Sequence, residues 1–138
     1  MKVSAKGKYG VRAMAILALE FHEGPVPLRE IAEREDISFQ FLEQIFQPLR
    51  RAGLIDSVRG AKGGYVLAKA PDKVKVGDVL RALEGPIAPV ECVIEGNNNA
   101  CGRSAACLTR VVWERLRDSM SEVLDDITLA DVIKMSAE

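Results

Sequence analysis

The feature that most constrains this chain is a glycine-rich tip between two short β-prone segments, which follows two helical patterns without a long linker. Residues 55–59 and 65–68 contain β-branched and aromatic side chains, and the glycines of residues 60–64 allow the chain to reverse between them. This pattern predicts a β-hairpin with Arg59 and Lys62 near its tip.

Two helical patterns precede this hairpin. The first opens near Pro27, where proline suits the first turn of a helix, and the second starts after Ser38, a good N-cap, and ends at Gly53. Asp36 and Ile37 form the turn between them. The apolar residues of the second pattern recur at helical spacing, and they are Leu42, Ile45, Phe46 and Leu49. Two helices at this spacing followed by a hairpin are typical of a winged helix-turn-helix.

Further helices are expected on both sides of this unit. Residues 9–21 are apolar almost all round and stop before Gly24 and Pro25, which predicts a buried scaffold helix. A fourth helix is expected over residues 76–83, and a short closing helix is capped by Thr128. A long helix from about residue 105 to residue 126 is predicted by an apolar stripe, whose members are Leu108, Val112, Leu116, Met120, Val123 and Ile127.

Together these elements predict a mainly α fold with a small β-hairpin wing, in which a winged helix-turn-helix is joined to a long dimerisation helix. We expect a DNA-binding domain over residues 1–86, a cysteine-bearing sensor loop over residues 87–104, and the dimerisation helix with a short C-terminal helix over residues 105–138. Because the long helix exceeds what its own small domain needs, we expect it to pair with a second copy. The alternative is that it packs back on the first helix of the same chain.

Length and charge limit the classes of protein that fit. A chain of 138 residues holds one small domain and one extension. No apolar stretch reaches the roughly 20 residues of a membrane span, and residues 1–4 do not resemble a signal peptide, so a cytoplasmic protein is expected. The formal net charge is −1, but residues 1–70 carry 11 Lys and Arg against 8 Asp and Glu. The positive half therefore coincides with the winged unit.

An enzyme is not expected. The chain has one histidine and lacks the H-E-x-x-H, G-x-S-x-G and G-x-x-x-x-G-K-[ST] patterns. Residues 60–64 are similar to a phosphate-binding loop in glycine content only, because they lie between two strands and do not lead into a helix N-terminus.

The polar face of the third helix is the candidate surface for reading DNA. Short or planar polar side chains suit contacts with base edges, and Ser38, Gln40 and Gln44 provide them, while Glu43 is suited to accept from a cytosine amino group. The alternative for each residue is a solvated position without a partner.

The basic residues near this face are the candidate contacts with phosphate. Arg59 on the hairpin suits the minor groove, and Lys62 at the tip suits a phosphate contact. Lys6, together with Lys2 and Lys8, precedes or opens the first helix and is a candidate clamp on the DNA backbone. A basic chain end that is only solvated is the alternative for these lysines.

Three cysteines, Cys92, Cys101 and Cys107, lie in and just after the predicted loop. An odd number of cysteines in a chain without a secretion signal argues against a disulfide framework and leaves metal binding, redox chemistry or no role. A structural zinc site with a distant fourth ligand is one further alternative.

Several stretches of the chain together resemble one family of regulators. They are residues 42–44 (LEQ), 49–54 (LRRAGL), 58–65 (VRGAKGGY), 83–86 (LEGP) and 127–131 (ITLAD). These motifs are similar to those of the Rrf family of winged-helix transcription regulators, and in particular to its branch of iron–sulfur cluster regulators. The resemblance implies a homodimer whose long helices pair and which binds double-stranded operator DNA, acting as a repressor, through the recognition-helix and wing residues named above.

The resemblance also implies a cofactor. In the cluster-binding branch three cysteines of each chain hold an iron–sulfur centre, so Cys92, Cys101 and Cys107 would hold a cluster, [2Fe-2S] in preference to [4Fe-4S]. Arg110 stands where the branch has a histidine ligand, which leaves the fourth ligand open. Another branch of the family is regulated by a partner protein instead of a metal, and a small-molecule effector is a further alternative.

Overall fold

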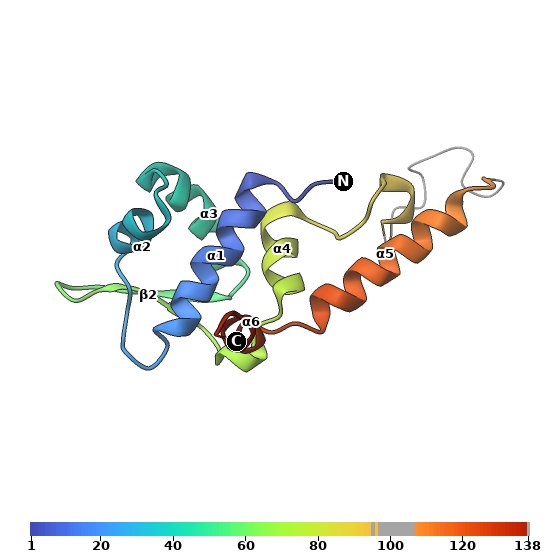
Figure 1. Ribbon diagram of the computed structural model, residues 1–138. Helices are drawn as coiled ribbons and strands as arrows, with labels where there is room; N and C mark the ends of the chain where they lie inside the picture. Colours follow the sequence, from blue (N-terminus) through green and yellow to red (C-terminus); the bar gives the residue numbers. More distant parts are fainter. Residues whose placement is uncertain (95, 97–106, 138) are drawn as a thin grey trace.

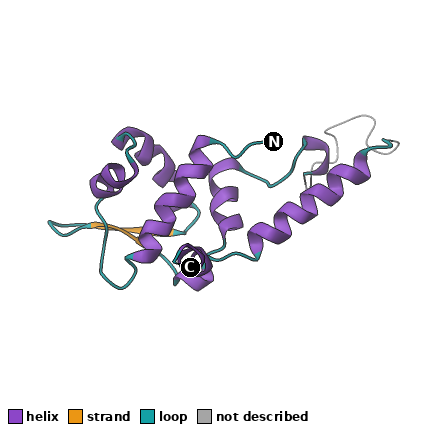
Figure 2. Ribbon diagram, in the orientation of Figure 1, coloured by secondary structure: helices purple, strands orange, loops and turns teal. Residues whose placement is uncertain are grey.

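The computed structural model describes residues 1–94, 96 and 107–137, and within them it is mainly helical with one small sheet (Figures 1 and 2). The elements in chain order are α1 (Ala5–Leu19), α2 (Leu28–Glu35), α3 (Phe39–Arg51), β1 (Ile55–Val58), β2 (Gly64–Leu67), η1 (Pro71–Lys73), α4 (Val76–Glu84), η2 (Glu91–Val93), α5 (Arg110–Asp125) and α6 (Leu129–Ser136). This architecture confirms the predicted winged helix-turn-helix with a further long helix.

Helix α1 is the centre of the core and contacts α2, α3 and β2 as well as α4 and α6 (Figure 1). Its apolar side chains point in several directions, as expected for a scaffold helix, and Ala13 and Met14 are fully buried. Two glycines, Gly7 and Gly10, bring α1 close to α4, since a Cβ at Gly10 would collide with the side chain of Leu83. The helix begins four residues earlier than residue 9, at Ala5, because Ser4 caps it by accepting from the amide of Gly7.

The α2–turn–α3 unit forms as the sequence predicts. Asp36 ends α2 in the left-handed region with φ of 52°, and Ser38 caps α3 by accepting from the amide of Phe41 at 3.0 Å. The four apolar residues predicted for the buried face of α3 all lie in the core, and they are Leu42, Ile45, Phe46 and Leu49. The orientation of α3 is therefore fixed by its apolar stripe, which leaves the opposite side toward solvent.

The hairpin pairs antiparallel, with Ile55 opposite Leu67 and Val58 opposite Gly64. One further backbone pair widens it: the amides of Val26 and Tyr65 each donate to the other residue's carbonyl, at 3.0 and 2.9 Å. Gly64 is required there, because its φ is 156° and a side chain would meet the backbone of Val26. The sequence did not predict this third strand segment, since Val26 lies between two prolines without any alternation.

The C-terminal elements return to the core. Thr128 caps α6 by accepting from the amide of Asp131, as predicted, and Leu129 is fully buried. Backbone hydrogen bonds from Val76 to Ile127 and from Leu129 to Val74, both 2.9 Å, hold this segment beside the start of α4. Contacts of α6 with α1 place it on the winged unit.

Helix α5 extends away from the rest of the molecule, on the side opposite to the hairpin (Figure 1). Its 16 residues span about 24 Å, and none of them is buried. The helix contacts α4 and η2 and starts at Arg110, five residues later than predicted, since Leu108 and Thr109 form a turn before it. The apolar period continues upstream to Leu108, which is 95% exposed.

Among the described residues, no helix is both long enough and apolar enough to cross a lipid bilayer.

Candidate nucleic-acid interface

The face of α3 opposite the core carries the predicted reading residues. Ser38, Gln40, Glu43 and Gln44 are all exposed. In the described part of the molecule, the side chains of Gln40, Glu43 and Gln44 form neither hydrogen bonds nor ion pairs with other residues. Their polar atoms are therefore available to a ligand, at the N-terminal half of the helix that would enter a groove.

Ser38 differs from the other three residues because its hydroxyl oxygen already accepts the amide hydrogen of Phe41. The hydroxyl hydrogen still lacks a fixed acceptor, so Ser38 can donate to a base or a phosphate while it caps the helix. The Ser38 side chain thus caps α3 and also offers a hydrogen-bond donor on the exposed face of the helix.

The hairpin adds positive charge beside α3. Arg59 and Lys62 are exposed near its tip, and neither is paired with an acidic group among the residues that the structure describes. The tip is held by the amide of Gly63, which donates to the Gly60 carbonyl at 3.0 Å. Gly63 leaves no room for a side chain, since a Cβ there would collide with the carbonyl of Val58.

The lysines near the N-terminus lie on α1 or just before it. Lys6 is half-buried, whereas Lys2 and Lys8 are exposed. The chain before α1 is anchored because the amide of Ser4 donates to Glu84 at 2.8 Å and its hydroxyl contacts the same carboxylate. This contact to the end of α4 fixes the position from which these lysines extend.

The cysteine segment is described in part. Cys92 is half-buried on η2 and Cys107 is exposed before α5, while Cys101 lies outside the described residues. The hydroxyl of Thr109 lies 3.3 Å from the sulfur of Cys107, and this hydrogen bond lowers the pKa of the thiol. The thiolate, which is the form that binds metals, is therefore favoured at Cys107.

Two arginines of α5, Arg110 and Arg117, form polar contacts close to these cysteines. Arg110 pairs with Glu114 at 2.6 Å. The Arg117 guanidinium donates to the carbonyl of Val93 at 2.8 Å, and Val93 is buried directly after Cys92. The cysteine segment is thereby fastened to α5. Within the described chain no group of three His, Cys, Asp or Glu residues could hold a metal.

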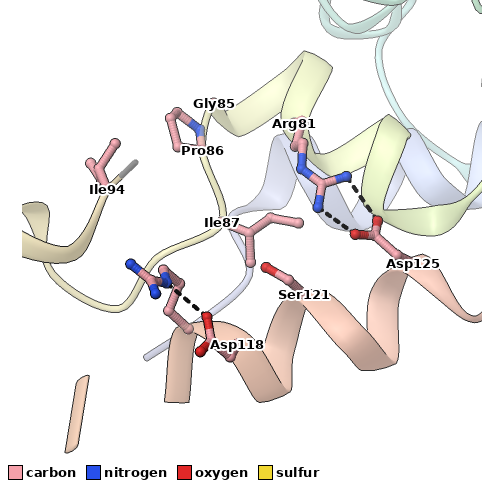
Figure 3. Close-up of a pocket in the computed structure, with 9 residues that line it drawn as sticks. Arg81, Gly85, Pro86, Ile87, Ile94, Asp118, Ser121 and Asp125 are labelled. Atoms are coloured by element: carbon pink, nitrogen blue, oxygen red, sulfur yellow. Dashed lines mark hydrogen bonds and ion pairs between the residues drawn. The ribbon is translucent and has the colours of Figure 1, made fainter. Parts of the chain in front are cut away.

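A cleft of about 720 Å³ lies between α4, the segment after it and α5 (Figure 3). Arg81 and Asp125 form two hydrogen bonds of 2.8 and 2.7 Å at one end, and these bonds lower the pKa of Asp125. Ile87 and Ser121 line the middle of the cleft. The volume is in the range of small-molecule sites.

The hydrogen bonds that join α5 to the rest of the chain could not be predicted from the sequence. Arg81 and Asp125 are 44 positions apart, and Arg117 and Val93 are 24 apart. No local period or motif links residues at such separations, because the packing of the helices alone brings these pairs together. The opposite charges of Arg81 and Asp125 were the one available signal.

Comparison with known proteins gives consistent results. Residues 3–135 match the family model Rrf2, described as an iron-dependent transcriptional regulator. The chain is 48% identical to the transcriptional regulator CymR of Bacillus subtilis over 96% of this chain and 89% of that protein. It is 44% identical to the regulator IscR of Erwinia tasmaniensis, over 96% and 79%.

Solved structures agree with the sequence relatives. The structure of CymR, the global cysteine regulator of B. subtilis, superposes with a TM-score of 0.81 at 45% identity and covers 98% of each chain. That of T. potens IscR gives a TM-score of 0.81 at 48% identity, covering 100% of this chain and 89% of that one. These relatives are regulators, which agrees with the expectation that the chain is not an enzyme. The chain therefore belongs to the Rrf2 family of transcriptional regulators.

Proposed function

We propose that this regulator binds double-stranded operator DNA as a homodimer and acts as a repressor. The observation that carries this proposal is the exposed, unpaired polar face of α3, which is followed in the chain by a hairpin whose tip carries two exposed, unpaired cations. In this proposal Ser38, Gln40, Glu43 and Gln44 contact base edges in the major groove. Arg59 reaches into the minor groove, and Lys62 and Lys6 neutralise phosphates.

The dimer is supported by the state of α5. A helix in a protein is stabilised mainly by packing its apolar side, yet α5 has no buried residue and exposes Val112 and Val123, which lie eleven positions apart on the same side. In this proposal a second α5 covers that side. Because the hairpin and α5 lie on opposite sides of the molecule, pairing through α5 would leave both reading surfaces free on the outside of the dimer (Figure 1).

In-vitro selection tests this function. The parent chain is incubated with duplexes that carry a randomised centre, and bound sequences are recovered over several rounds. A dimer that reads two half-sites selects sequences with two-fold symmetry, with half-sites about one helical turn apart. Enrichment of an asymmetric single site contradicts the dimer, and no enrichment contradicts sequence-specific DNA binding.

For sensing, we infer that Cys92, Cys101 and Cys107 hold an iron–sulfur cluster, [2Fe-2S] in preference to [4Fe-4S]. The donor chemistry fits, because the pKa of Cys107 is lowered and Cys92 is fixed against α5 through Val93. When bound, the cluster would supply a redox-sensitive group. The hydrogen bond from Arg117 to the Val93 carbonyl then connects the state of the cysteine segment with α5, the helix that we assign to dimerisation.

Anaerobic purification with metal analysis tests the cluster. We expect a brown protein with visible absorbance and about two irons per chain. The Cys92→Ser variant should lose both, while Ser104→Ala, a change near the cysteines that removes no thiol, should retain them. A colourless protein without iron after anaerobic reconstitution contradicts cluster binding, and zinc in its place indicates a structural site.

The second candidate is regulation without a metal, and the similarity to CymR of B. subtilis favours it. In that case a partner protein or a small molecule would set the affinity for DNA. The cleft beside Arg81 and Asp125 is one place in the described structure where a small effector would fit. Unchanged DNA affinity in Cys92→Ser and Cys107→Ser variants would support this candidate against the cluster.

A further inference from the structure

Phe39 is a large apolar side chain that lies outside the core. It is the first residue of α3 and is 44% exposed, between Ser38 and Gln40, which are exposed as well. Phe41, two positions on, packs against the core instead and meets the ring of Tyr9 edge-on at a centroid distance of 6.0 Å. Of the two phenylalanines in the first turn of α3, Phe39 is therefore the one that faces solvent.

The surroundings of Phe39 form an open depression between α2 and α3 of about 620 Å³. Arg29 of α2 and Gln40 line it together with the Phe39 ring. Arg29 is exposed and has no acidic partner among the described residues. Glu33 and Asp36 line the hollow as well. An apolar ring, a cation without an ion pair, an amide and two carboxylates therefore border one hollow at the N-terminal end of the proposed recognition helix.

The bases of DNA offer one apolar group in the major groove, the C5-methyl group of thymine. Apolar side chains at the start of a recognition helix contact this methyl, whereas polar neighbours contact the heteroatoms of the same or adjacent bases. A guanidinium beside the ring suits the phosphate that flanks such a base. Burial of the ring would also remove apolar surface from water.

We propose that Phe39 is a specificity-determining residue that packs on the methyl group of a thymine in each half-site, with Arg29 on the adjacent phosphate. This inference rests on the proposed function, since it requires that α3 enters the major groove. A wedge between base pairs is disfavoured by this placement, because wedging side chains act from the minor groove. The role assigned to Phe39 is a preference for thymine over the other three bases at one position.

A methyl-deletion experiment tests the inference. The duplex selected by the full-length parent chain is prepared with each thymine in turn, and its symmetry mate, replaced by deoxyuridine, which removes only the methyl group. At one symmetric pair we expect the parent to lose affinity by about fourfold per thymine, the value of one buried methyl-sized group. The Phe39→Ala variant should bind the thymine and deoxyuridine duplexes at that pair equally well.

Two further variants serve as controls for the effect of Phe39→Ala. Phe39→Leu retains an apolar side chain and should remain sensitive to deoxyuridine, and Gln47→Ala, on the same helix, should behave as the parent does. Thermal unfolding of each variant checks the fold, and the deoxyuridine scan on the parent itself decides even where a variant is unstable.

The same experiments distinguish a failure of the role of Phe39 from a failure of the proposed DNA binding. If the parent selects a duplex but no deoxyuridine replacement weakens binding, or if Phe39→Ala retains the parent's sensitivity, the role of Phe39 is overturned while DNA binding stands. If the parent selects no duplex at all, the proposed function fails, and the inference fails with it.

Discussion

At the scale of single residues, Ser38 combines two roles that substitutions can separate. Ser38→Ala removes the acceptor for the Phe41 amide and should lower the free energy of unfolding by about 1 kcal/mol. Ser38→Asp keeps an acceptor at the cap but places a negative charge on the proposed DNA face. We expect this variant to unfold like the parent in urea and to bind the selected duplex more weakly. Parent-like DNA binding by Ser38→Asp would remove Ser38 from the interface.

The exposure of the α3 side chains could be predicted from the sequence because helical spacing alone assigns Leu42 and Ile45 to the core and Gln44 to the surface. The exposure of Phe39 could not be predicted in this way. Its apolar side chain suggests burial, and its spacing of three residues from Leu42 places it on the buried face of the helix. Only the packing of α2 against α3 determines that the hollow next to Phe39 stays open.

At the scale of elements, the Arg81–Asp125 pair joins α4 to α5 and should give a pH-dependent stability. Hydrogen bonds from Arg81 lower the pKa of Asp125, so the pair stabilises the fold above the unfolded-state pKa of about 3.9. That contribution is lost as the pH falls through the lower folded-state pKa.

Asp125→Asn should lower the free energy of unfolding at pH 7 by roughly 0.5–1 kcal/mol, since both side chains are a third exposed and partly screened. Urea unfolding from pH 7 to about pH 2.5 should show parent and variant converging at the acidic end. Asp118→Asn is the control, because Asp118 is far more exposed and should cost little at any pH. A constant difference over the whole range would contradict this role of Asp125.

The types and order of the helices and strands followed from local signals, whereas their ends depended on contacts. The predicted caps Ser38 and Thr128 are confirmed, because capping is an interaction between residues close in the sequence. The start of α5 at Arg110 was missed because the apolar period continues to Leu108 beyond the helix. The backbone pair of Val26 with Tyr65 was missed because strand pairing joins residues far apart in the sequence.

At the scale of the whole molecule, the unburied side of α5 leads to a prediction about assembly. Val112→Glu places a charge on that side and should convert a dimer into a monomer, measured by sedimentation at micromolar concentration. Leu19→Glu is the matched control, since Leu19 is as exposed as Val112 but lies at the far end of α1. A dimer that persists in Val112→Glu would show that α5 does not form the interface.

DNA binding through α3 and the hairpin tip can be measured in a binding titration at two salt concentrations. Gln44→Ala should lose about 1–3 kcal/mol on the selected duplex and little on a scrambled one. Lys62→Ala should weaken binding to both duplexes alike and reduce the salt slope by about 1. Lys73→Ala, an exposed lysine on η1, should match the parent. If Gln44→Ala and Lys62→Ala both bind as the parent does at each salt concentration, DNA is read by another surface and the account is wrong.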